Sequence, residues 1–136
     1  MIHFDEALRL VLSNVPILPI IEKNNYAINS DILAQDIRAK EDLPLFSNSA
    51  MDGFALRSED THPVPVDLKI KGCIKAGDPP GIKVGEGEAV KIMTGAPLPE
   101  GADAVVMVED TEEKERKVLI KRSLEQGANV RIKGEE

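Results

Sequence analysis

The first residues of the chain follow the pattern of an amphipathic helix. Apolar side chains recur there at the spacing of a single helix face, at Phe4, Ala7, Leu8, Val11 and Leu12. Asp5 and Glu6 lie in the first turn, where the helix dipole favours negative charge. Asn14, followed by Pro16, marks the end of the pattern. We therefore predict a short helix over residues 4–12, with an apolar stripe that needs a covering surface.

A second short helix is predicted over residues 30–37. Ser30 is a candidate N-cap, because its hydroxyl can accept a hydrogen bond from a backbone N–H of the first turn. The apolar residues that would form the buried side of this helix are Ile32, Leu33, Ala34 and Ile37.

Beyond about residue 38 the helical spacing gives way to short β-branched runs separated by glycines and prolines. Between residues 68 and 75 apolar or small residues alternate with lysines and Cys73, which predicts a strand with one face in water. Further strands are predicted over residues 89–93, 104–108 and 117–121. The charge-rich stretch 109–117 is predicted to be a solvated turn. Short strands with frequent turns favour a compact β module over βαβ units.

Composition and charge narrow the function classes. Of 136 residues 42% are hydrophobic, which is enough for a packed core, but only 3% are aromatic. A net charge of −7 opposes nucleic-acid binding, and no aromatic platform for stacking bases is available. Cys73 is the single cysteine, so no disulfide forms within the chain. The longest apolar run, residues 15–21, contains two prolines and is too short to cross a membrane, so a cytoplasmic protein is expected.

Residues 44–55 form the first of two loops with candidate chemistry. The pair Asp52-Gly53 favours a tight turn, because glycine tolerates positive φ and aspartate bonds to nearby backbone. One interpretation is an ordinary hairpin loop. The other is a carboxylate presented from a rigid turn, able to bind Mg²⁺ or to orient a water molecule.

Residues 90–104 form the second loop. Thr94 and Gly95 directly follow a predicted strand, and a hydroxyl beside an unshielded backbone N–H could cradle a phosphate or molybdate oxyanion. The alternative is a hydroxyl that only stabilises a turn. The spacing is not that of a Walker loop, and the sequence contains neither a zinc pattern nor a supported catalytic triad.

These two loops coincide with stretches that resemble the signatures of the MoeA and gephyrin E-domain family. Residues 43–55, LPLFSNSAMDGFA, are similar to the family pattern P-x-F-x-x-S-A-M-D-G-[YF]-A. Residues 87–106, GEAVKIMTGAPLPEGADAVV, resemble the second signature, and Glu109 matches the acidic residue that follows it. Ala76-Gly77 and residues 127–135 match two further landmarks in the same order. The resemblance therefore runs from Phe4 to the last residue, with small departures such as Lys91 for the commoner arginine.

The resemblance implies an enzyme that inserts molybdenum into molybdopterin. Its substrates would be molybdate and molybdopterin in its adenylylated form, and its cofactor Mg²⁺ or another divalent cation. Asp52 matches the family's functional aspartate and would hold the cation, while Thr94 matches its functional threonine and would donate to a phosphate or oxyanion oxygen. The residues implied to bind substrate, by shaping the loops that present this pair, are Ser49, Gly53, Gly95 and Ala96.

The resemblance also implies a mostly β fold with two short helices, in which a compact, barrel-like β module is joined to a small linker subdomain. The helix in residues 1–14 would dock on a downstream domain. Residues 15–43 together with 117–136 would form the linker subdomain. Residues 44–116 would form the β module that carries the active-site loops.

An α/β pterin-binding domain and a C-terminal β domain are expected to follow residue 136, and the partner subunit of a homodimer would complete the cleft. The chain by itself is therefore expected to be an inactive half of an intersubunit site, with neither nucleic acid nor membrane as a partner. The alternative is a non-catalytic assembly or dimerisation module of the same fold. The sequence does not distinguish molybdenum from tungsten, or one divalent cation from another.

Overall fold

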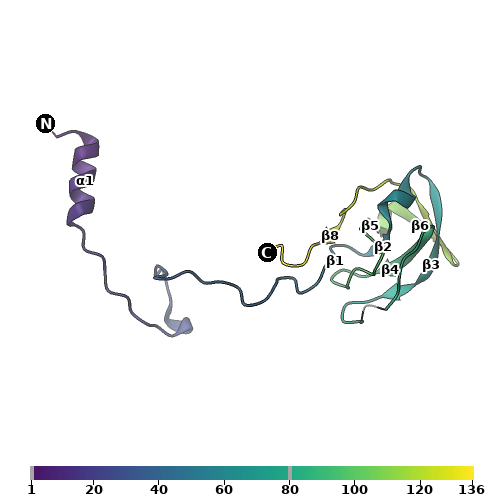
Figure 1. The fold of residues 1–136 in the computed structure, drawn as a ribbon, viewed down its shortest axis with the longest axis horizontal. Helices are drawn as coiled ribbons and strands as arrows, with labels where there is room; N and C mark the ends of the chain where they lie inside the picture. The colour runs from purple at the N-terminus through teal and green to yellow at the C-terminus, as the bar shows by residue number, and fades with distance from the viewer. Residues whose placement is uncertain (1, 80) are drawn as a thin grey trace. The chain divides into compact units, whose positions relative to one another are not determined.

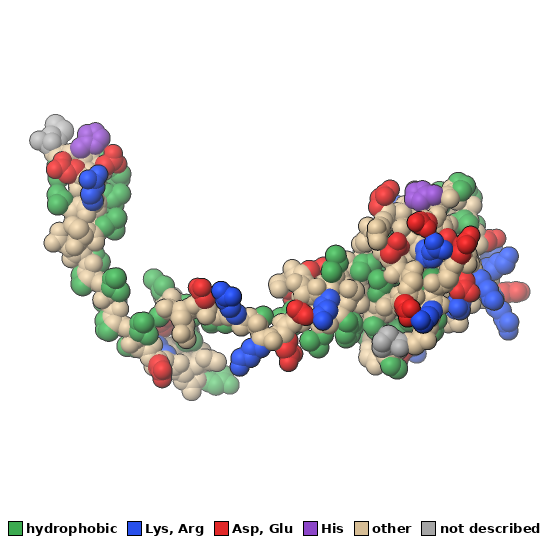
Figure 2. Space-filling model, in the orientation of Figure 1, with side chains coloured by type: hydrophobic (Ala, Val, Ile, Leu, Met, Phe, Trp, Pro, Cys, Tyr) green, Lys and Arg blue, Asp and Glu red, His purple; other side chains and the backbone are tan. Residues whose placement is uncertain are grey.

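The computed structural model describes residues 2–79 and 81–136, and the chain divides into two compact units, Met1–Arg38 and Ala39–Glu136 (Figure 1). The first unit contains helix α1 (Phe4–Asn14) and the 3₁₀ turn η1 (Asn25–Ala27). The predicted first helix is thus confirmed. None of its residues is buried, and its hydrophobic side chains lie on the surface, green in Figure 2.

The second predicted helix, over residues 30–37, is wrong. These residues form bends and irregular backbone, and Ser30 has a φ of +58° instead of the extended geometry of an N-cap. Ile32 is 96% exposed. An eight-residue helix makes few internal hydrogen bonds and depends on packing of its apolar side, and this side is not covered within the unit.

The second unit is built on a six-stranded sheet in the order β5-β2-β4-β3-β7-β6, with a separate two-stranded pair β1-β8. β3 and β4 run parallel, and the other neighbours are antiparallel. The strands are β1 (Asn48–Ser49), β2 (Gly53–Leu56), β3 (Val66–Ile74), β4 (Glu88–Ile92), β5 (Ala104–Met107), β6 (Thr111–Lys114), β7 (Lys117–Ile120) and β8 (Val130–Arg131).

The connection between the two edge strands requires this sheet to curl. β5 and β6 lie at opposite ends of the strand order, yet only the 3₁₀ turn η3 (Val108–Asp110) joins them. In a flat sheet the two edges would be separated by five spacings of about 4.8 Å, roughly 24 Å in all. The link from Met107 to Thr111 reaches at most about 14 Å. The sheet therefore forms the half-barrel seen in Figure 1.

Both faces of the central strands are packed, so β2 is buried along its whole length. One face carries the cluster of Phe54, Leu56, Leu68, Ala89, Ala104, Val106, Val118, Ile120 and Leu124. The other face carries the cluster of Ala55, Ile74, Val84, Val90, Ile92, Ala96 and Val105. This double burial fixes β2, and with it the loop that precedes it, firmly in the module.

The strands predicted from sequence are confirmed as β3, β4, β5 and β7, and the mostly β fold class with them. The charge-rich stretch predicted as a turn is only partly one, because Thr111–Lys114 form the edge strand β6 and the reversal is confined to the residues before β7. Charged side chains suit an edge strand, since they discourage pairing with other chains. Lys117–Ile120, assigned from sequence to the linker subdomain, pair with β3 in the same sheet.

Candidate functional site

Asp52 lies in the loop directly before β2. Its backbone carbonyl accepts a hydrogen bond from the N–H of Val108 at 3.1 Å, which ties the end of the loop to η3. The next residue, Gly53, packs against β5 so closely that a Cβ atom there would lie 1.8 Å from the carbonyl oxygen of Val106. Glycine is therefore required at this position because of the close backbone approach, and not for a positive φ.

Thr94 lies in the turn that follows β4. The N–H of Ala96 donates to the carbonyl of Met93 at 2.9 Å, and Gly95 takes a φ of +78°. Gly53 at the start of β2 faces Ile92 at the end of β4, because the two strands are antiparallel neighbours. The Asp52 loop and the Thr94 turn, which are about forty residues apart in sequence, thus meet where β2 begins and its neighbour β4 ends.

The side chains of Asp52 and Thr94 are in direct contact and both residues are exposed. The N–H of Thr94 donates to Oδ1 of Asp52 at 2.7 Å, and the hydroxyl of Thr94 donates to the same oxygen at 2.8 Å. These two hydrogen bonds, the backbone one first, lower the pKa of Asp52 from its ordinary value of 3.8. The sequence predicted both residues as site residues, and the structure brings them together. Their catalytic role stays a prediction.

The pKa shift gives a prediction for pH titration. Since the folded-state pKa of Asp52 is lowered, its contribution to stability is fully present above pH 3.8 and is lost as the pH falls through the folded pKa. Thr94→Val removes the hydroxyl donor but keeps the backbone N–H. We expect the pKa of Asp52 to rise part of the way to 3.8 in this variant. Carboxyl ¹³C NMR in metal-free buffer measures both values, and an Asp52 in the unsubstituted chain that titrates at 3.8 or higher would contradict the assigned hydrogen bonds.

The geometry differs from the open oxyanion cradle predicted for Thr94-Gly95. Both donors of Thr94 are directed at Asp52, and the N–H of Gly95 donates to the carbonyl of Ser49 at 2.8 Å. The atoms left to meet a ligand are instead acceptors, namely Oδ2 of Asp52 and the hydroxyl oxygen of Thr94. Within the described ranges 2–79 and 81–136, no side chain or backbone group donates to Oδ2 of Asp52. A free carboxylate oxygen beside a hydroxyl oxygen attracts a cation or a hydrogen-bond donor, and not a bare anion.

The four residues predicted to bind substrate differ in exposure. Ser49, Gly53 and Ala96 are buried, while Gly95 is exposed. Ser49 connects the two loops, since its N–H donates to the carbonyl of Ala96 at 3.0 Å and its carbonyl accepts from Gly95. These positions fit residues that shape the loops, and direct contact with a substrate stays a prediction.

Sequence reasoning missed a third segment that holds the Asp52 loop. The N–H of Ala50 donates to the carbonyl of Asn129 at 2.9 Å, and Ser49 in β1 pairs with Val130 in β8. The available signal was the stretch 127–135, which matched the family pattern but was assigned to the linker subdomain and not to the site. The side-chain chemistry of Asn129 does not by itself predict a contact with the Asp52 loop.

The described residues contain no group of three or more His, Cys, Asp or Glu side chains arranged to hold a metal ion. Asp52 is therefore a single carboxylate. A cation bound there would need further ligands from substrate or water, which is the usual way that Mg²⁺ is bound at phosphate sites.

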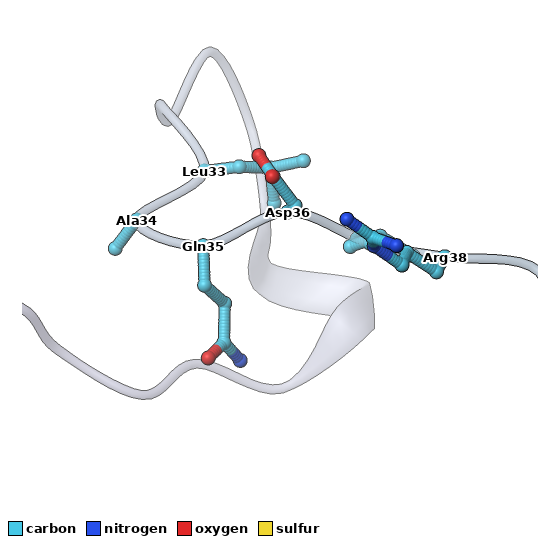
Figure 3. Close-up of a pocket in the computed structure, with 6 residues that line it drawn as sticks. Leu33, Ala34, Gln35, Asp36 and Arg38 are labelled. Carbon is cyan, nitrogen blue, oxygen red and sulfur yellow. The ribbon is translucent and has the colours of Figure 1, made fainter.

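Surface hollows also lie elsewhere among the described residues. One is lined by the consecutive residues Leu33–Arg38, whose side chains point in different directions from a single irregular segment (Figure 3). Another is lined by residues 39–43 with Gly134 and Glu136. Neither Asp52 nor Thr94 lines these hollows, and the first, which is formed by one continuous segment, does not enclose a ligand.

Comparison with known protein families identifies the family to which the chain belongs. The sequence profile of the MoeA N-terminal region (domain I and II) matches residues 2–136. The chain belongs to this family. As an MoeA N-terminal region it is 39% identical to a molybdopterin molybdenumtransferase of Synechococcus elongatus, over 99% of the chain and 35% of the relative. It is also 39% identical to one of Staphylococcus aureus, over 96% of the chain and 32% of the relative.

Solved structures support the same kinship. The MoeA protein of Pyrococcus horikoshii, a molybdopterin biosynthesis protein, matches with a TM-score of 0.80 and 33% identity over 96% of this chain and 36% of that one. Another crystal structure of a molybdopterin biosynthesis MoeA protein from the same organism matches with a TM-score of 0.70 and 43% identity, over 74% of this chain and 27% of that one. The chain thus spans about a third of the length of the relatives it matches. Among the described residues no helix has the length and apolar character needed to span a lipid bilayer.

Proposed function

We propose that this MoeA N-terminal region is part of an enzyme that inserts molybdenum into adenylylated molybdopterin, and that it contributes half of a site shared between the subunits of a homodimer. Membership of the family supports the proposal, as do relatives named molybdopterin molybdenumtransferase. The observation that carries it is the exposed contact between Asp52 and Thr94, each from a different family signature.

The donor set of this pair fits Mg²⁺ or a similar divalent cation. Carboxylate and hydroxyl oxygens are hard ligands, and the two hydrogen bonds from Thr94 go to Oδ1 of Asp52, not to Oδ2. Asp52 would hold the cation, and substrate phosphate oxygens and water would complete its coordination. When bound, such a cation supplies charge neutralisation at the phosphoanhydride that breaks as AMP leaves.

The protein's own residues prepare this step. Thr94 fixes the orientation of the carboxylate through its two hydrogen bonds, and the same bonds lower the pKa of Asp52 by favouring its charged form. Ser49 and Gly95 connect the two loops through their backbone hydrogen bonds.

The uncovered apolar stripe of α1 supports the further proposal that this helix packs on another domain of the full-length protein.

The alternative, a non-catalytic assembly module, is favoured by one observation. Every donor of the Thr94-Gly95 turn is satisfied inside the protein, as expected of a purely structural lock between two loops. The two proposals differ in whether the carboxylate of Asp52 is used by a ligand.

A chimeric enzyme tests the proposed function. The 136 residues replace the corresponding region of the Synechococcus elongatus molybdopterin molybdenumtransferase, which the chain covers over 35% of its length. With adenylyl-molybdopterin, molybdate and Mg²⁺, we expect equal amounts of AMP and molybdenum cofactor. A folded, dimeric chimera that forms neither product would refute the enzymatic proposal and favour the assembly module. The unsubstituted Synechococcus enzyme, assayed in parallel, confirms that the substrates are competent.

A further inference from the structure

A tight turn at residues 127–129 covers the outer edge of β5. The N–H of Val105 donates to the carbonyl of Ala128 at 2.9 Å, and the carbonyl of Val105 accepts from Nδ2 of Asn129 at 2.8 Å. The N–H of Gly127 also donates to the carbonyl of Asp103 at 2.8 Å. The N–H and carbonyl of Val105 in β5, and the carbonyl of Asp103 just before it, are thus used to anchor the turn.

The same turn holds the first part of the Asp52 loop. The carbonyl of Asn129 accepts a hydrogen bond from the N–H of Ala50, two residues before Asp52, at 2.9 Å. The far end of the loop is held by Val108, which donates to the carbonyl of Asp52. Asn129 therefore supplies one of the backbone anchors that hold the loop from which the Asp52 side chain is presented to Thr94.

The conformation of Asn129 explains the residue type. Its φ is +55°, in the left-handed region that asparagine tolerates better than other residues with a Cβ atom. Its amide also donates to β5, which glycine, the other residue suited to this φ, lacks a side chain to do. Asparagine meets both demands together, whereas an ionised aspartate has no proton to donate.

We propose that Asn129 is a positioning residue, which ties the Asp52 loop to β5 and thereby holds the carboxylate of Asp52 on Thr94. Its value to catalysis rests on the proposed function. The positioning itself does not, and it is tested without substrate.

NMR of the 136-residue chain at neutral pH, in metal-free buffer, tests this inference. In Asn129→Gly the φ is retained and the amide is lost. We expect the Thr94 amide proton, now less firmly bound to the carboxylate, to move upfield. We also expect hydrogen exchange at Ala50, Thr94 and Gly95 to accelerate at least tenfold more than exchange at the core amides of β2 and β4. Asn129→Asp, which keeps size and φ tolerance, should shift the same signals in the same direction.

Thr61→Val is the matched control. Buried Thr61 accepts from the N–H of Leu124 at 2.9 Å and donates to the carbonyl of Ser58 at 2.7 Å, so the variant loses hydrogen bonds of the module outside the Asp52 loop. It should leave the Thr94 amide shift unchanged. Asn129 variants with an unaltered Thr94 signal would overturn the positioning role. So would a failure of both variants to fold, because Asn129 would then support the whole module and not this loop.

Discussion

Gly53→Ala is expected to destabilise the chain more than any other single substitution proposed for it. The added methyl group would lie 1.8 Å from the carbonyl oxygen of Val106 and 3.2 Å from Cα of Met107, both on the backbone of β5. Backbone cannot rotate away as a side chain can, so β2 and β5 must separate at the place where both are buried. Overpacking of this kind costs about 3 kcal/mol or more, which lowers the melting temperature of a domain of this size by roughly 10 to 20 °C.

Gly77→Ala provides the matched comparison. Gly77 has a φ of +90°, but a Cβ atom there meets nothing within 4 Å. Only the left-handed backbone is then penalised, by about 1 to 2 kcal/mol. Thermal unfolding followed by circular dichroism compares the two variants. A Gly53→Ala chain that melts within a few degrees of the unsubstituted chain, or above Gly77→Ala, would show that β2 and β5 do not approach as closely as described.

Asp52→Asn is expected to have the largest effect on activity. The amide keeps the shape of the side chain and can still accept from Thr94, but it carries no charge with which to hold a divalent cation. In the chimeric enzyme at saturating substrate we expect kcat for molybdenum insertion to fall by on the order of a hundredfold or more, with a smaller change in the affinity for the pterin. Rapid-quench measurement of AMP release, together with equilibrium binding of the pterin, separates the two effects.

Asp78→Asn is the control for a lost surface carboxylate. Asp78 is also an exposed turn residue, and its Oδ2 accepts from the N–H of Lys75 at 2.8 Å. Its substitution should leave kcat unchanged. If Asp52→Asn instead weakens pterin binding and preserves kcat, Asp52 contacts the substrate in the ground state and does not hold a catalytic cation. Calorimetric titration with Mg²⁺ should show weaker binding by Asp52→Asn than by Asp78→Asn.

Much of the fold follows from local sequence, where alternation is strong. β3 and β7 alternate between covered and more exposed positions, and this is the signal that a period of two detects. β4 and β5 are covered on both faces and were predicted from their runs of apolar, mostly β-branched residues. β2 was missed because its four residues include no β-branched side chain, and Gly53 and Ala55 are small. β6 was missed because its charges are those of an edge strand, which resemble those of a turn.

The sequence predicted which residues belong to the candidate site, but it did not predict the hydrogen bonds between them. Two family signatures named Asp52 and Thr94, and the antiparallel register of β2 and β4 explains why residues that far apart meet. Which donor would serve which acceptor depends on backbone positions that no local pattern specifies. The predicted cradle therefore placed the Thr94 donors toward a ligand, whereas the structure directs them to Asp52. The anchoring of the Asp52 loop by Asn129 was not predicted, for the same reason: it depends on a hydrogen bond to Val105, some two dozen residues away in sequence.

The double hydrogen bond from Thr94 has a consequence for the energetics of ligand capture. An aspartate on a free loop samples several rotamers, and a ligand that needs one of them must restrict the others when it arrives. Here Oδ1 is already held by two donors of one residue, and the loop around it is tied to neighbouring strands on both sides. The entropy of the carboxylate is therefore lost when the chain folds, so an incoming cation or hydrogen-bond donor meets a side chain whose direction is already set.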